Sequence, residues 1–216
     1  MSTSMLTKWV LICSGMLASV ASAGPANFDA DLATIQQRWA VANYQMTDRS
    51  EQKQAFEALS ASAHQLSLDN PTRAEALTWE GIVLSTYAGV KGGLGALGLA
   101  KKSRALFERA LEIDPLALQG SAYTSLGVLY SKVPGFPVSF GDDDKARELL
   151  LKALSINADG IDTNYFYAQF LCDQKRCSQA LPYLEKAAKA PPRPGREVAD
   201  QGRHREVLEL MAKAKG

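Results

Sequence analysis

Two cysteines, two histidines and one isolated acid are the residues in this chain whose types could support chemistry. Cys172 and Cys177 lie five residues apart, whereas His64 and His204 are far apart and no motif joins them. Glu80 follows a tryptophan on an expected helix, where a lone carboxylate is usually structural or solvated. The sequence contains none of the usual signatures of serine hydrolases, zinc proteases or phosphate-binding loops. We therefore expect no catalytic residues and no enzyme activity.

Three further patterns bear on cofactors and metals. The glycines at positions 93, 95 and 98 match a dinucleotide-binding fingerprint, but that fingerprint follows a strand, and here a helix is expected. The three aspartates at 142–144 lack the ligand spacing of a calcium loop and are better placed to cap a helix. Two thiols alone do not complete a zinc site. We expect no cofactor and no metal.

The first 23 residues have the pattern of a secretory signal peptide. Lys8 is their one charged residue, an apolar run covers residues 9–20, and Ala-Ser-Ala ends the segment. The apolar run is shorter than the roughly 20 residues that a membrane-spanning helix needs. We expect cleavage between Ala23 and Gly24, a periplasmic or secreted mature chain of residues 24–216, and no membrane insertion after cleavage. An uncleaved membrane anchor is the alternative.

Export determines the redox environment of the remaining cysteines. Cys13 would leave with the signal peptide, so Cys172 and Cys177 would form an even pair in an oxidising compartment. Residues five apart on a continuous helix have Cα atoms roughly 8.6 Å apart, beyond the roughly 7 Å limit for a disulfide. The expected Cys172–Cys177 disulfide therefore requires a break in the helix between them. Two buried free thiols near a turn are the alternative.

The composition is that of a neutral, folded protein. The chain has 216 residues, enough for one domain with a core, and 46% of them are hydrophobic. Without residues 1–23 it carries 23 basic and 23 acidic side chains. This balance gives no reason to expect nucleic acid or anionic lipid as a partner.

One helical segment occurs three times in degenerate form. Each copy has a small residue, a large apolar residue four positions later, an alanine three after that, and Pro or Ala five further on. The copies span residues 103–115, 146–158 and 180–192. A second helical pattern precedes each copy, over residues 74–84, 121–130 and 162–171. Such repetition predicts a stack of antiparallel helix pairs, each burying its apolar face against the next.

These positions resemble the tetratricopeptide-repeat (TPR) family, whose second helices carry Ala, Phe, Ala and Pro. The matching residues are Ser103, Phe107, Ala110 and Pro115; Ala146, Leu150, Ala153 and Ala158; and Ala180, Leu184, Ala187 and Pro192. The resemblance implies an all-α, TPR-like α-solenoid of antiparallel helix pairs with three repeats over residues 74–192. A helical hairpin over 24–73 would precede them and a capping helix over 193–216 would follow. Gly81 and Gly127 are expected where a partner helix approaches closely.

The first two repeats carry insertions between their helices. Gly81 and Ser103 are 22 residues apart and Gly127 and Ala146 are 19 apart, against 12 in the third repeat. Both inserted segments, 87–99 and 133–141, are predicted to be neighbouring apolar loops. They would form a binding patch, or pack on each other, or close partially and leave a ligand-sized cleft.

The second insertion and the helix that follows it also resemble the T component of TRAP transporters. Those are exported helical-repeat proteins that associate with a solute-binding protein. This weaker resemblance implies an alternative function for the chain, as a small-molecule-binding protein or a transporter accessory.

The TPR resemblance implies a non-catalytic scaffold or adaptor that binds another protein or peptide of the bacterial-type envelope. In that family the first helix of each pair lines the concave face. Repeat register and the two insertions give the candidate partner-binding residues, which are Thr78, Ile82, Ser85, Thr124, Val128, Tyr165, Gln169, Leu94, Leu97, Phe136 and Phe140.

The C-terminal segment is predicted to be an amphipathic helix that closes the stack. Its expected apolar side consists of Val198, Val207, Leu208 and Met211. Its arginines are expected to be solvated, with an anion site as the alternative; they are Arg193, Arg196, Arg203 and Arg205.

Overall fold

The computed structural model describes residues 27–215, except for the side chain of Leu94, and the predicted signal peptide lies outside these residues. The described α-helices are α1 (Phe28–Tyr44), α2 (Arg49–Asp69), α3 (Ala74–Lys91), α4 (Gly93–Ile113), α5 (Ser121–Lys132), α6 (Asp143–Ile156), α7 (Ile161–Asp173), α8 (Leu181–Ala188) and α9 (Glu197–Lys215). Residues 27–215 contain no β-strand, so the predicted all-α class is confirmed. None of these helices is both long and apolar enough to cross a membrane.

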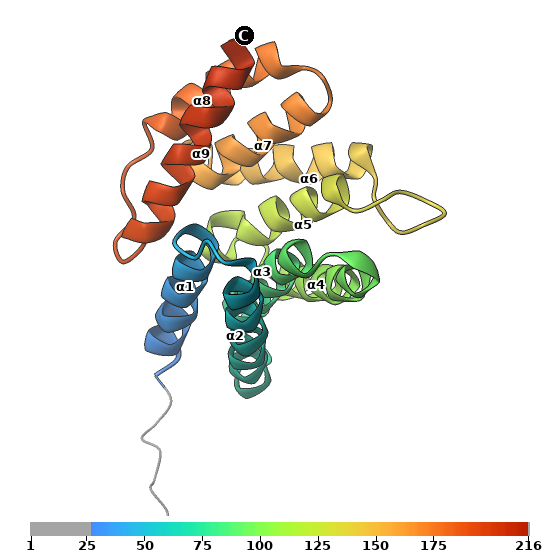
Figure 1. The fold of residues 1–216 in the computed structure, drawn as a ribbon, viewed down its shortest axis with the longest axis vertical. Coiled ribbons are helices and arrows are strands. Elements are labelled where there is room, and N and C mark those ends of the chain that lie inside the picture. The colour runs from blue at the N-terminus through green and yellow to red at the C-terminus, as the bar shows by residue number, and fades with distance from the viewer. Residues whose placement is uncertain (1–26, 216) are drawn as a thin grey trace, which may run out of the picture.

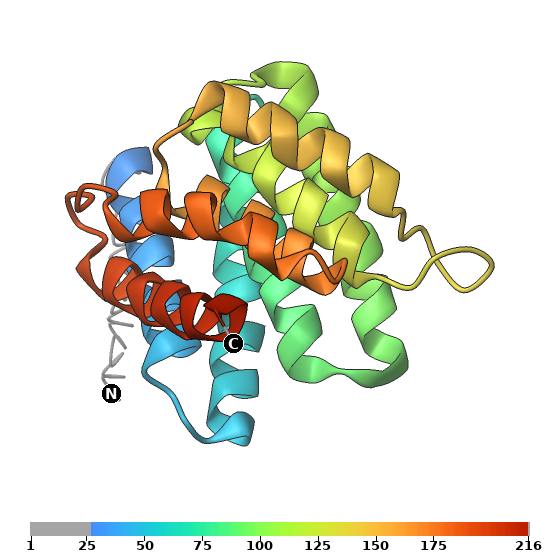
Figure 2. The ribbon, with the colours of Figure 1, turned by 90° about the horizontal axis from the view of Figure 1, so that it is seen from above.

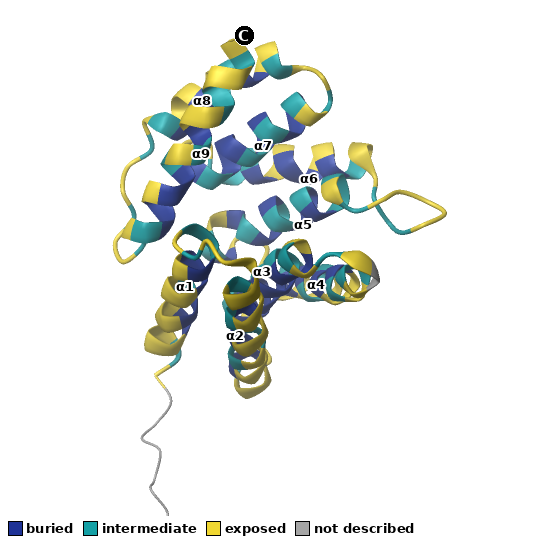
Figure 3. Ribbon diagram, viewed as in Figure 1, coloured by how far each residue is buried: buried dark blue, intermediate teal, exposed yellow. Residues whose placement is uncertain are grey.

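Consecutive helices form antiparallel hairpins that stack along the long axis of the molecule. Figure 1 shows α1–α4 at one end, α5 and α6 in the middle, and α7–α9 at the other end. The exposed residues follow the outer faces of the helices and the tip of the α5–α6 loop, whereas buried residues face the neighbouring helices (Figure 3). This arrangement is the predicted solenoid of helix pairs.

Helix starts follow the local sequence. The Asp48 carboxylate accepts hydrogen bonds from the backbone N–H groups of Ser50 and Glu51 at 2.9 and 2.8 Å, and so caps α2. The Asp142 carboxylate accepts from the Lys145 N–H at 2.9 Å at the start of α6. Two more aspartates occupy the first turn of α6, where negative charge favours the helix dipole. The capping function expected for residues 142–144 is confirmed.

Small residues set the distance between the two helices of a repeat. A Cβ added to Gly81 would lie 2.5 Å from the Phe107 ring, and one added to Gly127 would lie 2.8 Å from Leu150. The Ser103 hydroxyl also donates a 2.7 Å hydrogen bond to the Gly81 carbonyl. The close approach predicted at these two glycines is confirmed.

The last helix returns to the first. The N-terminal core cluster consists of residues from α1, α2 and α3, and it also contains Ala199 of α9. A Cβ added to Gly202 would lie 2.3 Å from the Tyr44 ring, so α9 packs tightly against the end of α1. Figure 2 shows α9 beside α1 at one side of the molecule. The C-terminal helix therefore brings the two ends of the solenoid together, in addition to covering α7 and α8.

The predicted loop over residues 87–99 is wrong, because this insertion lengthens two helices. Helix α3 continues to Lys91, and α4 begins at Gly93 after a single connecting residue. Gly92 and Gly93 both have φ near 64°, which glycine adopts without steric cost. The apolar residues of the insertion find partners on regular helices, since Val90 and Leu99 pack against the N-terminal core cluster.

The second insertion is a loop, as predicted. Phe140 lies edge-to-face on Tyr130, with ring centroids 5.4 Å apart, at the base of the loop. Phe136 and Val138 at the tip are 93% and 63% exposed. Figure 2 shows the tip projecting away from the helices. Only the base of this loop joins the core.

The two cysteines meet at the turn between α7 and α8. Helix α7 ends at Asp173, and Lys175 adopts a left-handed φ of 58°, which breaks the helix between the cysteines. The sulfur atoms of Cys172 and Cys177 lie within disulfide distance, with Cα atoms 4.0 Å apart. The break that the spacing required is therefore present.

A glycine-to-alanine pair tests the packing of the first repeat. Gly81→Ala should lower the free energy of unfolding by about 1–3 kcal/mol, because its methyl group overlaps the Phe107 ring. Gly89→Ala, in the same helix, meets no atom within 4 Å and should be neutral or stabilising by up to about 1 kcal/mol. Denaturant unfolding followed by circular dichroism measures both values. Equal effects of the two substitutions would contradict the close approach.

Candidate functional site

A cleft of about 1000 Å³ lies on the inner side of the closed solenoid. Its walls come from the first helices of successive pairs, α1, α3, α5 and α7, together with α9 and the segment 190–196 that precedes it. The start of α4 and the base of the α5–α6 loop close its far side. The cleft is therefore formed by residues that are distant in the sequence.

Some of the candidate binding residues line this cleft. They are Ile82, Ser85, Leu97, Thr124 and Val128. Ala96, Leu97 and Ala100 of α4 oppose Val133 and Pro134 of the loop, so the two insertions contribute walls of one cleft. Residues of both insertions therefore border the same cleft.

The structure places the other candidates elsewhere. Thr78 is fully buried and Tyr165 is 6% exposed. Gln169 donates a 3.2 Å hydrogen bond to the Tyr165 hydroxyl and does not line the cleft. Phe136 is at the exposed loop tip, and Phe140 packs on Tyr130. Leu94 belongs to α4, but its side chain lies outside the described residues.

One wall of the cleft is aromatic. The rings of Trp39 and Trp79 meet edge-to-face with centroids 5.9 Å apart, and Tyr44 meets Trp39 at 5.8 Å. The Trp39 indole N–H donates a 3.0 Å hydrogen bond to the Thr86 hydroxyl, which holds α1 against α3. Sequence analysis gave no signal that Trp39 would meet Trp79 in the cleft.

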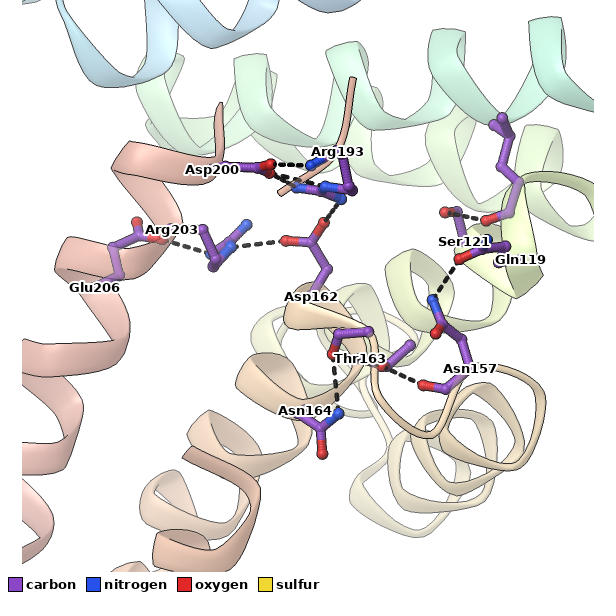
Figure 4. A network of polar contacts seen from close by, with 12 residues as sticks. Gln119, Ser121, Asn157, Asp162, Thr163, Asn164, Arg193, Asp200, Arg203 and Glu206 are labelled. Carbon is purple, nitrogen blue, oxygen red and sulfur yellow. Dashed lines mark hydrogen bonds and ion pairs between the residues drawn. The ribbon is translucent and has the colours of Figure 1, made fainter. Parts of the chain in front are cut away.

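A network of charged side chains forms the wall near α9 (Figure 4). The Asp162 carboxylate accepts hydrogen bonds from Arg203 Nε at 2.8 Å and from Arg193 Nη1 at 2.6 Å. Arg193 also binds the Asp200 carboxylate, and Arg203 donates to Glu206 at 2.5 Å. The network joins the start of α7 to α9 and to the segment before it.

Tyr44 extends this network to α1. Its hydroxyl lies 3.3 Å from a Glu206 carboxylate oxygen, to which it donates. Burial raises the pKa of the Tyr44 phenol, and Glu206 adds to the rise against the opposing effect of Arg203. The phenol is therefore a proton donor throughout the physiological pH range. Through this contact the charged network spans both ends of the solenoid.

Electrostatics favour the charged forms of the central ion pair. Burial alone would raise the pKa of Asp162, but Arg203 and Arg193 outweigh it and lower the pKa to about 2. Burial alone would lower the pKa of Arg203, but the Asp162 carboxylate outweighs the effect of burial, so the pKa of Arg203 is raised. The Arg203 guanidinium also lies over the Tyr165 and Phe166 rings, 4.5 and 4.3 Å from their centroids. Such cation–π contacts favour a buried arginine.

The structure corrects two expectations about α9. Its arginines were expected to be solvated, but the Arg203 side chain is 8% exposed and doubly paired. Leu208 was expected on the apolar side, but it is 62% exposed, whereas Val207 is fully buried. Periodicity predicted the helix but not its buried face, because Arg203 is buried where it pairs with Asp162 of α7.

A second polar cluster holds the loops at the α5–α7 side of the cleft. The Asn157 side-chain amide donates a 2.9 Å hydrogen bond to Gln119, and its backbone carbonyl accepts from the Thr163 hydroxyl at 2.7 Å. Leu118 and Gln119 both have left-handed φ values, 49° and 55°, which are uncommon outside glycine. Figure 4 shows this cluster facing the cleft beside the charged network.

The histidine and acid singled out above form a structural contact. His64 Nδ1 lies 2.8 Å from the Glu80 carboxylate, and the Ser67 hydroxyl donates to the same carboxylate. The Glu80 carboxylate thus lies between the serine and the imidazole, so the Ser67 hydroxyl contacts the acid and not the histidine ring. The contact joins α2 to α3. Residues 27–215 contain no group of three side chains that could hold a metal ion.

The comparisons with known proteins confirm the fold. No family model matches the chain, and no curated protein matches it. Among solved structures it is similar to TTC0263, a thermophilic TPR protein of Thermus thermophilus, with a TM-score of 0.57 and 18% identity over 87% of this chain and 89% of that one. The similarity to MamA, with a TM-score of 0.44 and 16% identity over 79% and 94% of the two chains, is too low to carry an argument. The chain has the fold of TPR proteins.

Asp162→Asn tests the charged network. At pH 7 it should lower the free energy of unfolding by about 3 kcal/mol, because it leaves two arginines short of their shared partner. The contribution of Asp162 is present above the ordinary Asp pKa of about 4 and is lost as the pH falls towards about 2. The difference from wild type should therefore shrink over that range in acid unfolding curves.

Asp173→Asn is the matched control. It breaks an exposed pair with Lys132 and should cost less than about 1 kcal/mol. The network would not hold the structure closed if the two substitutions had the same effect at pH 7.

Proposed function

We propose that this protein is a non-catalytic adaptor of the bacterial-type periplasm, whose cleft binds a segment of another protein. The observation that carries the proposal is the cleft itself, which the inner helices of the repeats build jointly. Stacked repeats commonly use such concave surfaces for binding. The TPR fold supports this proposal, since it is the fold of a scaffold.

The lining of the cleft suits an extended peptide. Ile82, Leu97 and Val128 offer apolar contacts for side chains. Ser85 and Ser125 place hydroxyl groups beside them, which can pair with the polar backbone of a peptide. A site of this mixed kind recognises a peptide by main-chain hydrogen bonds and by pockets for selected side chains.

The charged groups of the site support a binding role over a catalytic one. Asp162, Arg193 and Arg203 are engaged in mutual ion pairs, so they hold the wall of the cleft. The described residues that line the cleft include no histidine and no cysteine, so none of its serines has a histidine as a base.

Two features support a location in the cell envelope. The first 23 residues have the composition of a signal peptide. The geometry of Cys172 and Cys177 permits a disulfide, which persists in oxidising compartments. A partner in the envelope follows from this location.

The second candidate function is small-molecule binding, as a transporter accessory. The volume of the cleft, about 1000 Å³, is at the upper end of the range for small-ligand sites. A bound metabolite retained through purification and detected by native mass spectrometry would favour this candidate.

Site-specific photo-crosslinking tests the adaptor proposal. A photoreactive amino acid at Val128, inside the cleft, should form covalent adducts with another polypeptide in living cells. The same amino acid at Lys152, on the exposed side of α6, should form none. Mass spectrometry of the adduct identifies the bound segment. Adducts of equal yield at both positions, or none at position 128, would refute binding in the cleft.

Intact-mass analysis tests the proposed location and redox state. The protein recovered from the periplasm should begin at Gly24 and weigh two hydrogens less than its reduced form. Under denaturing conditions without reductant, a thiol reagent should add no mass. Two modified cysteines, or a chain that retains residues 1–23, would count against export with cleavage.

A further inference from the structure

One arginine of the cleft is left without an ionic partner. Arg196 lines the cleft beside the charged network, yet its guanidinium makes no salt bridge or side-chain hydrogen bond with the described residues. Its Nε atom is enclosed and lacks any acceptor. A buried polar atom without a partner is rare, and a charged one is costly to keep so.

The neighbouring arginines, Arg193 and Arg203, explain why Arg196 has no acidic partner. Arg193 binds both Asp162 and Asp200, and Arg203 binds Asp162 and Glu206. The acids near Arg196 are therefore engaged by other arginines. Burial lowers the pKa of Arg196, and the positive charge of Arg193 lowers it further. Arg196 therefore has no direct ionic partner among the described residues, although its neighbourhood contains as many acids as arginines.

The surroundings of Arg196 are apolar and aromatic. Its guanidinium lies over the Trp79 ring, 4.8 Å from the centroid. Ala199 and the prolines of the preceding segment line the same part of the cleft. A smaller cavity of about 230 Å³ between α1 and α9 also reaches Arg196 and Ala199. Space is therefore available beside the enclosed guanidinium.

We propose that Arg196 is an anion-binding group of the cleft, which takes a carboxylate carried on an apolar body. The planar guanidinium presents paired donors that match the two oxygens of a carboxylate. The apolar part of the ligand lies along Trp79, Ile82 and Val128, which continue the cleft from this point. A strongly hydrated phosphate fits this apolar wall less well than a carboxylate.

The carboxylate has two sources. It belongs either to an acidic side chain of the bound peptide segment or to a free organic acid. The peptide source rests on the adaptor function proposed above, whereas the organic-acid source corresponds to small-molecule binding. Both use the same contact with Arg196, and one experiment separates them.

The experiment follows the Arg196 Nε–H resonance of isotopically labelled protein, assigned by its loss in Arg196→Lys. The peptide probe is acetyl-Leu-Ala-Glu-Leu-amide, with the Gln-containing peptide as its neutral counterpart. The organic-acid probe is octanoate, with 1-octanol as its neutral counterpart. Calorimetry measures the affinities. At least one acidic probe should shift the resonance and bind roughly tenfold to a hundredfold more tightly than its counterpart.

Two variants control for structural effects. Arg196→Gln should lose the preference for the acidic probe, and Arg196→Lys, which keeps the charge without the planar fork, should retain part of it. Arg205→Gln removes an exposed arginine from α9, the helix that follows Arg196, and should change nothing. Thermal unfolding of each variant shows whether its fold is intact, and the resonance of the wild-type protein gives an answer without any substitution.

The outcomes are distinct. A shift with the acidic peptide alone supports the peptide source, and a shift with octanoate alone supports the organic acid. No shift with either probe, or equal affinity for acidic and neutral probes, overturns the anion site. If crosslinking at Val128 succeeds while both probes fail at Arg196, the adaptor function stands and the anion site fails. If only octanoate binds and crosslinking at Val128 fails, the anion site stands and the adaptor function fails.

Discussion

The shared carboxylate of Asp162 is the interaction on which the shape of this molecule depends. It lies at the start of α7 and binds both Arg193, in the segment before α9, and Arg203, within α9. Arg203 continues through Glu206 to the Tyr44 hydroxyl on α1. An open stack of helix pairs has two free ends; here the ion pairs and the packing of Gly202 on Tyr44 bring the ends together. The cleft has an α9 wall because this closure exists.

The closure also determines which charges remain for a ligand. Three arginines and three acids are gathered where α7, α9 and the preceding segment meet. Because Arg193 and Arg203 each use two acids, those acids are not available to Arg196, which stays over Trp79 with its Nε enclosed. The same arrangement therefore stabilises the fold and leaves the Arg196 guanidinium at the cleft without a direct ionic contact. An adaptor that binds through such a cleft gains selectivity from an arginine without a partner, since a ligand without a matching anion leaves it unpaired.

Much of the fold was predictable because its signals are local. Small residues at Gly81 and Gly127 mark the close helix contacts, and the aspartate at 142 marks the start of α6. The need for a break between Cys172 and Cys177 followed from helix geometry alone. The turn at Gly92 was missed because an apolar, glycine-rich stretch resembles a loop when its packing partners are unknown. Its two glycines support a reversal between two helices, and Val90 and Leu99 pack on residues of the N-terminal hairpin.

What the sequence by itself determined was the pairing of the repeat helices and the small residues at which they meet, since these follow from spacing of three to four residues and from repeats. The tertiary structure alone decided which inner residues border a cleft and which are covered. Ile82, Val128 and Gln169 occupy the same position of successive repeats, yet the first two line the cleft and Gln169 pairs with the Tyr165 hydroxyl away from it. It also decided the partners of the arginines, because Asp162 is 31 residues from Arg193 and 41 from Arg203. Periodicity along one helix carries no information about charges that meet only when the chain closes on itself.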